Sequence, residues 1–480
     1  MIRVGAKYQH LAIPNVGCAC CAILSRRSLL AGLTMAAAGV ALMKTAPAQP
    51  APTPAEPKRG ILFSNVKLFN GRIGVPKPTN VLVRGNTIER ISPAQAQAGA
   101  DANVFVIDGG GRTLMPGLID AHAHVTFNTI SMPELIAGDP AYLQIRMATG
   151  ARDLLMAGFT SVRDAGGPVF GIRRAIEENR LDGPRIWAAG TMVSQTSGHN
   201  DFRSLADLPS AGNPGVVAGV RFRYSAVADG EPEVHRVVRE QLMQGANLIK
   251  LALGGGVSSN FDPVDVTEYT QAEVAAAVAD AENWGTYVTV HAYTPRAVRL
   301  AVGAGVRCIE YGQLLDEPTI KMLSDRGIWL STQPFLDDED GIPTVPGSEN
   351  ERKYKQVAEG TDRAYTAAKK YGVKLAFGTD IQFNPKGAVR QGFYLPKLAR
   401  WFAPADVLKM ATADNGELLA MSGPRNPYPG KLGVVEEGAL ADLLLVDGDP
   451  LSNLKLFEDP GKNLVVIMKN GKIYKDKISG

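Results

Sequence analysis

The central part of this 480-residue chain alternates short apolar segments with amphipathic ones, and this alternation constrains the fold more than any other feature. Short apolar runs between turn signals predict buried strands, and an apolar period of ~3.6 residues predicts helices. We expect eight strands, one that ends at His124 and seven more at Phe159–Asp164, Arg185–Ser194, Lys250–Leu253, Tyr287–Tyr293, Val306–Tyr311, Ile328–Gln333 and Lys374–Asp380. We expect helices at Leu143–Ala157, Glu231–Gln244, Gln271–Trp284, Pro295–Ala304 and Thr361–Tyr371. This order predicts an α/β fold, a (β/α)8 TIM barrel over residues 115–429, with its chemistry at the carboxyl ends of the strands.

The two ends of the chain beyond residue 58 have a different pattern, which predicts short strands separated by turns. These strands are expected at Ile61–Phe69, Asn80–Arg84, Thr87–Ile91, Ala441–Val446, Leu464–Met468 and Lys472–Tyr474. The dipeptide Asn470-Gly471 between the last two is a strong hairpin signal. Because neither end is long enough for a good core of its own, we predict that residues 59–114 and 430–480 pair into one small β-sandwich domain.

Residues 1–58 are expected to form an export signal and a Pro-rich spacer. Ser25-Arg26-Arg27-Ser28-Leu29-Leu30 precedes an apolar stretch from Ala31 to Met43, and Ala46-Pro47-Ala48 has the small residues of a cleavage site. This order is typical of a twin-arginine-like signal peptide and predicts a periplasmic or secreted protein. The apolar stretch is too short for a stable membrane span, and a transient anchor is the alternative.

The composition excludes several other classes of protein. The chain has 51 Lys and Arg against 48 Asp and Glu, and the net charge of +3 shows no basic stripe that would bind nucleic acid. Cys18, Cys20 and Cys21 lie in the predicted signal, so Cys308 alone remains for the body and no disulfide framework can form there. The hydrophobic content of 45% is enough for a large core.

The stretch Leu114–His124 ends in two histidines, His122 and His124, two residues apart on a predicted strand. Side chains alternate faces along a strand, so both imidazoles point the same way. Two neutral imidazoles on one face are natural ligands for a divalent metal. The alternative is a pair of surface or core histidines, but the chain has only six histidines, which makes a chance pairing a weak explanation. We therefore predict a metal site at the end of the first barrel strand.

Further polar side chains lie in or at the ends of the predicted barrel strands, namely Lys250, His291 and Asp380. With these residues, the chain resembles the amidohydrolase superfamily of metal-dependent hydrolases. The motifs that carry the resemblance are Leu114–His124, Gly158–Asp164, Gly245–Lys250, Phe377–Asp380 and Gly438–Val446, and they span nearly the whole chain after the signal. Within the superfamily, the chain is similar to the imidazolonepropionase-like branch, which includes Xaa-Pro dipeptidases and ochratoxin-type amidohydrolases.

The resemblance implies a metal centre whose ligands are His122, His124, Lys250, His291 and Asp380. It implies one or two divalent ions, most often zinc, and a carbamate formed on Lys250 by CO2 that bridges the two ions. A buried lysine with a depressed pKa suits this carboxylation. In the implied mechanism, a metal-activated hydroxide attacks an amide carbonyl, while Asp380 is a metal ligand and moves the proton to the leaving amine. The alternatives are an internal ion pair for Lys250 and a helix cap for Asp380.

The loop after the third predicted strand, Gln195–Asp201, contains His199. The resemblance implies that His199 binds the substrate near its carbonyl and takes part in catalysis, and a hydrogen-bonding loop residue is the alternative. A substrate carboxylate would need a cationic or hydroxyl partner. Arg203, Tyr224 and Arg390 lie in suitable loops, and the sequence does not choose among them.

The sequence departs from the family pattern at Tyr311. The family has a histidine ligand after Ile-Glu at the end of the sixth strand, whereas this chain has Ile309-Glu310-Tyr311-Gly312. A phenol with a usual pKa of ~10 coordinates only if a metal lowers that pKa strongly. Three interpretations are open: coordination by a phenolate, a weak or absent second metal, or a variant of low activity. We favour a weak or absent second metal with hydrolysis retained.

The leading functional prediction is a metal-dependent amidohydrolase that cleaves an amide bond of a dipeptide or an N-acyl amino acid, with ochratoxin-like aromatic amides as one candidate class. One alternative keeps the superfamily and changes the bond, as in a cyclic amide hydrolase or a one-metal deaminase. The other is a binding protein with an impaired metal site. The resemblance also implies a homo-oligomer that acts on a small-molecule amide.

Overall fold

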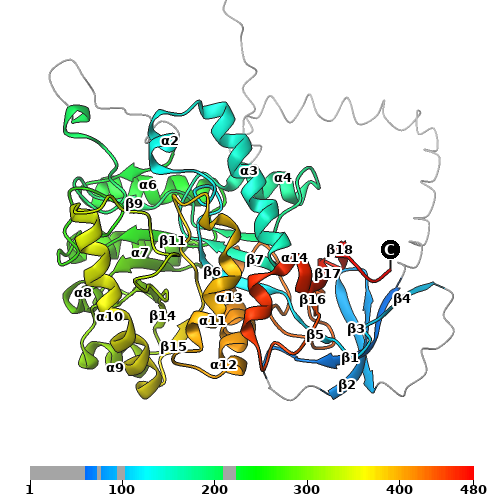
Figure 1. Ribbon diagram of the computed structural model, residues 1–480. Coiled ribbons are helices and arrows are strands. Elements are labelled where there is room, and N and C mark those ends of the chain that lie inside the picture. The colour runs from blue at the N-terminus through cyan, green and yellow to red at the C-terminus, as the bar shows by residue number, and fades with distance from the viewer. Residues whose placement is uncertain (1–59, 73–76, 94–102, 209–222, 480) are drawn as a thin grey trace, which may run out of the picture. The chain divides into compact units, whose positions relative to one another are not determined.

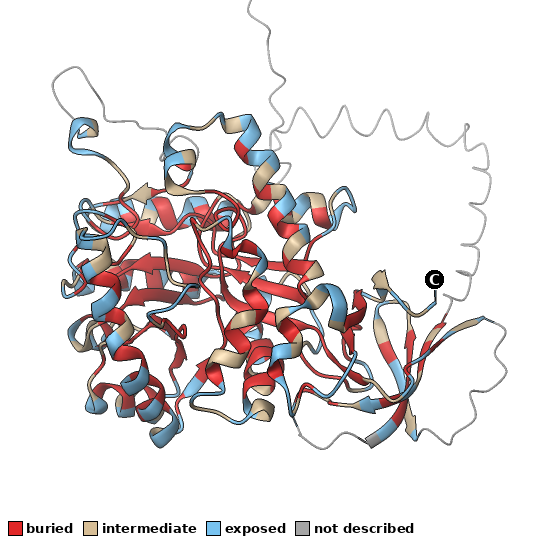
Figure 2. Cartoon of the chain, in the orientation of Figure 1, coloured by how far each residue is buried: buried red, intermediate tan, exposed pale blue. Residues whose placement is uncertain are grey.

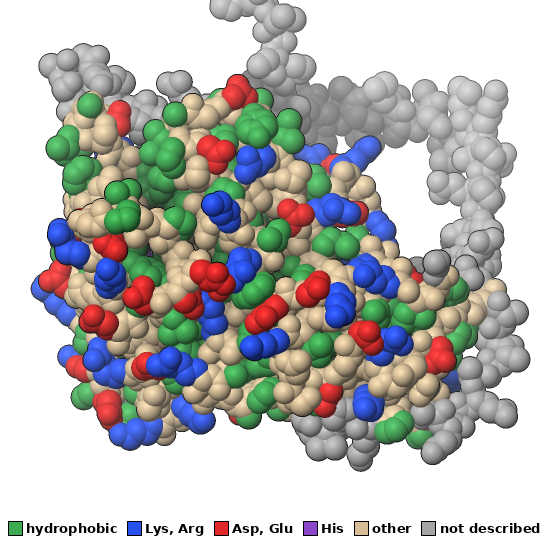
Figure 3. All heavy atoms as spheres, viewed as in Figure 1, with side chains coloured by type: hydrophobic (Ala, Val, Ile, Leu, Met, Phe, Trp, Pro, Cys, Tyr) green, Lys and Arg blue, Asp and Glu red, His purple; other side chains and the backbone are tan. Residues whose placement is uncertain are grey.

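A computed structural model describes residues 60–72, 77–93, 103–208 and 223–479. The predicted signal peptide and spacer at residues 1–58 lie outside these ranges. Within them, no helix is long and apolar enough to cross a membrane. On the face drawn in Figure 3, Lys and Arg side chains are interspersed with Asp and Glu side chains.

Parallel strands form the centre of the described chain, in two groups. The first group, in spatial order, is β6 (Leu118–Ala123), β7 (Phe159–Asp164) and β8 (Arg185–Ala188). The second group, in spatial order, is β10 (Ala226–Val227), β9 (Val193–Ser194), β11 (Ile249–Ala252), β12 (Val288–Ala292), β13 (Cys308–Tyr311), β14 (Trp329–Ser331) and β15 (Lys374–Ala376). The strands of the first group and β11 to β14 are buried throughout, as is typical of parallel strands covered on both faces.

Backbone hydrogen bonds also cross between the two groups of strands. The Ala121 amide donates to the Phe377 carbonyl just beyond β15 (2.9 Å), and the Asn247 amide donates to the Ala188 carbonyl at the end of β8 (2.8 Å). In the structure β15 ends at Ala376, earlier than the predicted end at Asp380. The backbone leaves the regular ladder here, because Asp380 has a positive φ of 52°.

Helices follow the central strands along the chain and lie around them in Figure 1. The helices are α2 (Met132–Ala137), α3 (Pro140–Met156), α4 (Phe170–Glu177), α6 (Glu231–Met243), α7 (Gln271–Asn283), α8 (Pro295–Gly303), α9 (Glu317–Asp325), α10 (Glu349–Tyr371), α11 (Tyr394–Leu398), α12 (Pro404–Lys409), α13 (Asn415–Ala420) and α14 (Pro460–Asn463). A π-helical turn (Met410–Asp414) joins α12 to α13. Figure 2 shows exposed residues on the outer helices and buried residues along the central strands.

Local sequence accounts for where many of these helices begin. The Thr270 side chain caps α7, and Glu273 reaches back to the Thr270 backbone to complete a capping box. The predicted start of the long helix at Thr361 is wrong, since α10 begins at Glu349 after the Ser348 cap. The first turns of α10 are rich in charged residues, so the apolar period of a helix is hard to recognise in the sequence there. In the structure these turns are helical and pack with the rest of α10.

Strands from both ends of the described chain pair in one eight-stranded sheet. Its order is β18 (Lys472–Asp476), β17 (Leu464–Lys469), β16 (Leu443–Val446), β5 (Thr113–Pro116), β1 (Gly60–Leu68), β2 (Lys77–Arg84) and β3 (Thr87–Pro93), with β4 (Val104–Asp108) paired to β1. Figure 1 shows the blue and red strands of this sheet side by side. In the turn between β17 and β18, Asn470 and Gly471 have φ of 57° and 71°, the conformation of a two-residue hairpin.

A buried ion pair joins the central strands to the terminal sheet. Arg185, the first residue of β8, donates from Nε to Asp442 Oδ2 (2.7 Å) and from Nη2 to Oδ1 (3.1 Å). The side chains of Arg185 and Asp442 are only 7% and 3% exposed. The Asn470 amide also donates to Asp442 Oδ1 (2.6 Å), so one carboxylate fixes the last hairpin and a central strand together.

We predict that Asp442→Asn lowers the free energy of unfolding by about 3 kcal/mol, because it leaves the buried Arg185 guanidinium without its counter-charge. Urea denaturation measures the loss. The matched control is Glu178→Gln, which breaks the exposed Arg174–Glu178 pair and is expected to leave the urea midpoint unchanged. Equal effects of the two substitutions would show that the buried pair has no special role.

Candidate active site

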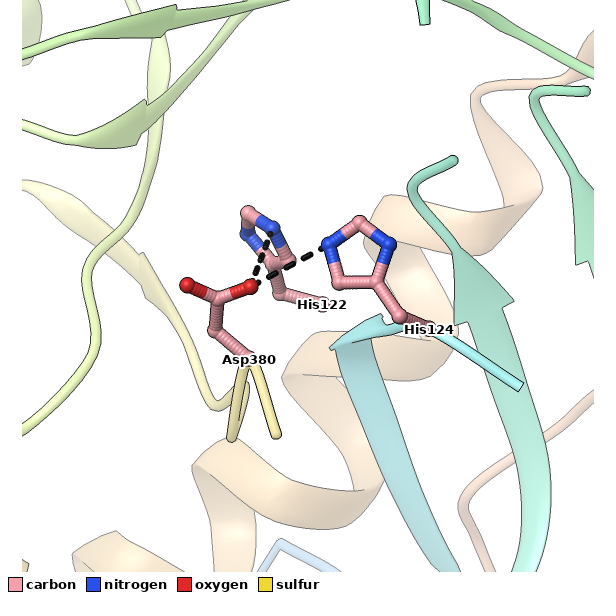
Figure 4. A group of neighbouring side chains, drawn as sticks. All are labelled: His122, His124 and Asp380. Carbon is pink, nitrogen blue, oxygen red and sulfur yellow. Dashed lines mark ion pairs between the residues drawn. The ribbon is translucent and has the colours of Figure 1, made fainter. Parts of the chain in front are cut away.

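The structure brings His122, His124 and Asp380 together at the ends of β6 and β15. Asp380 Oδ1 lies 3.1 Å from His124 Nε2 and 3.4 Å from His122 Nε2 (Figure 4). All three residues are buried, and their ligand atoms lie within 4.8 Å of one another. Two imidazole nitrogens and a carboxylate oxygen are a suitable donor set for a divalent cation. This group fits the metal site predicted from the spacing of the two histidines.

Asp120 fixes the backbone that presents these ligands. Its Oδ1 accepts hydrogen bonds from the amides of His122 (3.0 Å) and Thr379 (3.1 Å), and its Oδ2 accepts one from Thr379 Oγ1 (2.6 Å). The Asp380 amide donates directly to the His122 carbonyl (2.8 Å). Burial raises the pKa of Asp120 to about 7 despite these hydrogen bonds. Hydrogen bonds at successive residues therefore hold the loop after β15 against β6.

Hydrogen bonds to Nδ1 orient both imidazoles. His122 Nδ1 lies 2.9 Å from Glu310 Oε2, and His124 Nδ1 lies 3.0 Å from the Gly166 carbonyl oxygen. The Glu310 carboxylate also accepts a hydrogen bond from Arg163 Nη2 (2.6 Å). Burial acts to raise the pKa of Glu310, but the Arg163 guanidinium and other nearby charges hold it well below its usual range. Both Nε2 atoms are consequently directed toward Asp380, as metal ligands require.

Lys250 and His291 lie on the neighbouring strands β11 and β12. Lys250 Nζ is buried and has no hydrogen-bond partner among the described residues, and burial lowers the pKa of this amine to about 8. His291 Nε2 lies 3.0 Å from the Gly255 carbonyl oxygen, while His291 Nδ1 has no partner within the described ranges. Burial also holds the pKa of His291 well below its usual value. Carboxylation by CO2 would convert this unpartnered buried amine into a carbamate.

Tyr311 lies between the two groups of predicted ligands. Its hydroxyl donates to Asp380 Oδ2 (3.0 Å), and its ring centroid lies 5.0 Å from that of His122 and 4.3 Å from that of His291. Lys250 Nζ lies 5.3 Å from the ring centroid. Burial and the Asp380 carboxylate raise the pKa of Tyr311 well above its usual value, so the phenol keeps its proton. A protonated phenol is a weaker metal donor than the histidine that the family resemblance led us to expect at this position.

His199 lies against the same site from the loop after β9. Its ring stacks on His291, with 4.0 Å between the ring centroids. Its Nδ1 lies 2.6 Å from Ser259 Oγ and 3.2 Å from Asp262 Oδ2. A pocket opens beside this stack, and its lining residues are His124, Phe127, Gly166, Met192, His199, Asn200, Phe202, Tyr224, Lys250, Ser258, Tyr311 and Gln382.

Arg203, Tyr224 and Arg390 are the three predicted candidates for binding a substrate carboxylate, and they differ in their surroundings. Arg203 is paired with Asp201 through Nε and Nη2 (2.7 Å each), and Arg390 is paired with Asp340 and a second carboxylate. Tyr224 lines the pocket itself. The two guanidinium groups already have counter-charges, whereas Tyr224 is part of the pocket wall.

Sequence reasoning missed the positioning roles of Asp120, Arg163 and Glu310. Each is fully buried, Asp120 in β6, Arg163 in β7 and Glu310 in β13. A charged residue inside a predicted barrel strand was a usable signal, because such a charge is seldom buried without a partner. The partners themselves could not be found from the sequence, since Arg163 and Glu310 are 147 positions apart.

Comparison with known proteins agrees with this geometry. A model of the amidohydrolase family matches residues 113–474, and the chain belongs to that family. Ochratoxinase of Aspergillus niger is 30% identical over 373 residues, which cover 75% of this chain and 75% of the relative. The structure of another amidohydrolase is 34% identical, with a TM-score of 0.79 over 88% of this chain and 100% of the other. The structure of a prolidase in complex with N-methylphosphonate-L-proline is 31% identical, with a TM-score of 0.78 over 87% of this chain and 100% of the prolidase chain.

The family membership confirms the predicted TIM-barrel-like α/β fold and the predicted class of enzyme. The chain is a hydrolase that acts on carbon–nitrogen bonds of small molecules, with amide hydrolysis as its reaction. It is similar to ochratoxinase and to prolidase, in agreement with the branch identified from the motifs.

The buried amine of Lys250 predicts a pH-dependent contribution to stability. Its pKa falls from 10.5 to about 8 on folding, so between these values the unfolded chain binds a proton that the folded chain does not. The free energy of unfolding of the wild type, relative to Lys250→Met, is expected to rise by up to about 3 kcal/mol from pH 8 to 10.5. Urea denaturation of metal-free protein in CO2-free buffer measures this difference, and a flat difference would contradict the burial of an uncompensated amine.

Proposed function

We propose that the protein is a metal-dependent amidohydrolase that cleaves N-acyl amino acids or dipeptides. The observation that carries the proposal is the buried His122–His124–Asp380 group, with His124 on the wall of the pocket. Known proteins similar to this chain support the substrate class, because one is named for ochratoxin and another is a prolidase with a proline phosphonate bound.

The pocket wall favours a substrate with an apolar or aromatic acyl group. Phe127, Phe202, Tyr224 and Met192 supply one part of the lining, and Phe127 lies 6.1 Å from both the His124 ring and the Tyr224 ring, centroid to centroid. Aromatic side chains bury large apolar areas and stack on flat ligands. An ochratoxin-like aromatic amide is one candidate of this kind.

We propose that His122, His124 and Asp380 hold one divalent ion, with zinc as the expected metal, and that CO2 carboxylates Lys250. When bound, the ion supplies an acidified water and a Lewis acid for the scissile carbonyl. His291 and Tyr311 would complete a second site only weakly, because the Tyr311 phenol keeps its proton and is hydrogen-bonded to Asp380.

Asp380 is the proposed proton carrier of the reaction. Burial acts to raise the pKa of its carboxyl, but His122 and the hydrogen bond from His124 hold it below its usual value, so the group is ionised at neutral pH. The carboxylate accepts the proton of the attacking water and passes it to the leaving amine. The Tyr311 hydroxyl, which donates to Asp380 Oδ2, keeps the carboxylate oriented during this transfer.

We also propose the domain architecture, the export and the assembly of the protein. The central strands close into a (β/α)8 barrel over residues 115–429, and residues 59–114 and 430–480 form the composite β-domain, as a sandwich. The first 58 residues direct export through a twin-arginine-like signal, so the mature enzyme is periplasmic or secreted. The enzyme is a homo-oligomer and does not bind nucleic acid.

A second candidate function follows from Tyr311. If the phenol excludes the second ion, the site has the metal content of a one-metal deaminase or of a related cyclic amide hydrolase. A panel that contains N-acyl amino acids, dipeptides, cyclic amides and aminated heterocycles separates these reactions. Absence of both metal and turnover would instead favour a binding protein.

We predict that Asp380→Asn lowers kcat for N-acyl amino acids about 10²- to 10⁴-fold, because proton transfer loses its carrier. Initial rates with an aromatic N-acyl amino acid measure the loss. In a parallel experiment on the wild type, a chelator removes the metal and zinc is then added back. Asp325→Asn, at the exposed end of α9, is the matched control and is expected to leave the rates unchanged. Full activity of the chelated wild type would rule out metal-dependent hydrolysis.

We predict that Tyr311→His raises the metal content from about one to about two ions per chain, because an imidazole replaces a protonated phenol as donor. Elemental analysis of the purified protein, alongside the hydrolysis rate, measures the change. Tyr311→Phe is the matched control, since it removes the hydroxyl without adding a ligand. If Tyr311→His changes neither metal content nor rate, position 311 has no part in metal binding.

A further inference from the structure

A second cavity lies where the terminal sheet meets the central strands, and we call it the Lys469 cavity. Its volume is about 400 Å³, and its wall includes Arg185 at the amino end of β8, Tyr428 in the loop before β16, and Lys469, Lys472 and Tyr474 of β17 and β18. The predicted metal ligands lie in or near the carboxyl ends of their strands, and none of them lines this cavity. Pockets for small molecules have volumes of about 300 to 1,000 Å³ and often lie where two parts of a fold meet.

The charged side chains in the wall of the Lys469 cavity are mainly positive. Among the described lining residues, Arg185, Lys469 and Lys472 are basic and Glu177 alone is acidic. The ion pair with Asp442 compensates the charge of Arg185. The two lysines are therefore the cations that a ligand in the cavity could still pair with.

Lys469 is a buried cation without a counter-charge of its own. The residue is only 6% exposed, and its Nζ donates to the carbonyl oxygen of Gly183. An ammonium group has three hydrogens, and within the described ranges Nζ has no second acceptor and no ion-pair partner. Burial, together with the positive charges of Arg185 and Lys472, lowers the pKa of Lys469 to about 8. Because an uncompensated buried charge is costly, an anion in the cavity would be stabilised here.

Lys472 brings a second ammonium group to the same part of the wall. Lys469 Nζ lies 5.3 Å and Lys472 Nζ lies 4.6 Å from the centroid of the Tyr474 ring. Lys472 Nζ lies 3.6 Å from Asp182 Oδ1, but both side chains are about half exposed, so water and salt screen this pair. The carboxylate of a ligand beside Tyr474 would meet two ammonium groups.

The rest of the wall includes flat apolar surfaces. The Tyr428 ring packs edge-on against Trp187, with 4.9 Å between the ring centroids, and the Tyr428 hydroxyl donates to Glu177 Oε1 (2.9 Å). These contacts hold the Tyr428 ring in place. Three prolines also line the cavity, Pro184, Pro427 and Pro429. Rigid aromatic and proline side chains are suitable surfaces for a flat ring.

We propose that the Lys469 cavity is a binding site for a small aromatic carboxylate, whose carboxylate pairs with Lys469 and Lys472 and whose ring packs against Tyr428. The site is separate from the predicted metal ligands, and the inference does not depend on the proposed function. A ligand bound here contacts the start of β8 and the hairpin of β17 and β18 at the same time. Because it binds the folded chain alone, it stabilises the protein against unfolding.

The first test compares three probes by isothermal titration calorimetry on the full chain at neutral pH. The probes are 2-naphthoate, 2-naphthalenemethanol, which has the same ring without the charge, and acetate, which has the charge without the ring. We expect 2-naphthoate to bind, and each of the other two to bind about tenfold more weakly or less, because each lacks one of the two contacts. No binding of 2-naphthoate, or equal binding of either of the other probes, overturns the proposal.

The second test locates the binding by substitution. Lys469→Met is expected to weaken binding of 2-naphthoate about tenfold, and Lys472→Met about threefold, because each removes one charged contact. Lys472 is exposed, so its variant tests the site even if Lys469→Met does not fold. Lys475→Met is the matched control, since this lysine of β18 also donates to carbonyl oxygens, those of Pro460 (2.7 Å) and Gly461 (2.9 Å), but does not line the cavity.

Urea denaturation with and without saturating 2-naphthoate gives an independent measure of the same site. We expect 2-naphthoate to raise the urea midpoint of the wild type and of Lys475→Met, and to leave that of Lys469→Met nearly unchanged. Binding or stabilisation that both Lys469→Met and Lys472→Met leave intact belongs to another site, such as the pocket beside His124, and overturns the inference.

Discussion

The hydrogen bonds between β6 and the loop after β15 are the constraint on which the rest of the site depends. The Asp120 carboxylate bonds to the amides of His122 and Thr379, and the Asp380 amide bonds to the His122 carbonyl. Asn415 of α13 adds hydrogen bonds from Nδ2 to the carbonyls of both backbone segments. A shift of one residue at this junction would separate the carboxylate from the imidazoles, since neighbouring side chains on a strand face opposite sides.

Two imidazoles of the site are oriented in the same physical way, by a buried carboxylate whose charge is compensated from a distant part of the chain. Glu310 orients His122 and is paired with Arg163. Asp262 orients His199 and is paired with Lys353. A carboxylate alone would be costly to bury, and an imidazole alone would be free to rotate. The combination gives each ring one engaged nitrogen and one nitrogen available for metal or substrate.

Tyr311 changes the set of donor atoms in this site. A histidine in its place would bring a neutral donor to a second ion, whereas the phenol brings a proton, a hydrogen bond to Asp380 and an aromatic face beneath Lys250. Its backbone φ of 78° is unusual for a residue with a bulky side chain, so the surrounding structure holds it in place. The site therefore combines the His122–His124–Asp380 group, whose donors suit one divalent ion, with an altered donor at position 311.

The sequence by itself determined the alternation of strands and helices and the hairpin at Asn470-Gly471, and it singled out the neighbouring imidazoles of His122 and His124. These features are local, because apolar periodicity, turn residues and the two-residue repeat of a strand are visible over short stretches. Only the tertiary structure decided that the Tyr311 hydroxyl meets Asp380 and that Glu310 meets Arg163. These contacts join residues far apart in the chain, and their geometry depends on the packing of several strands and helices at once.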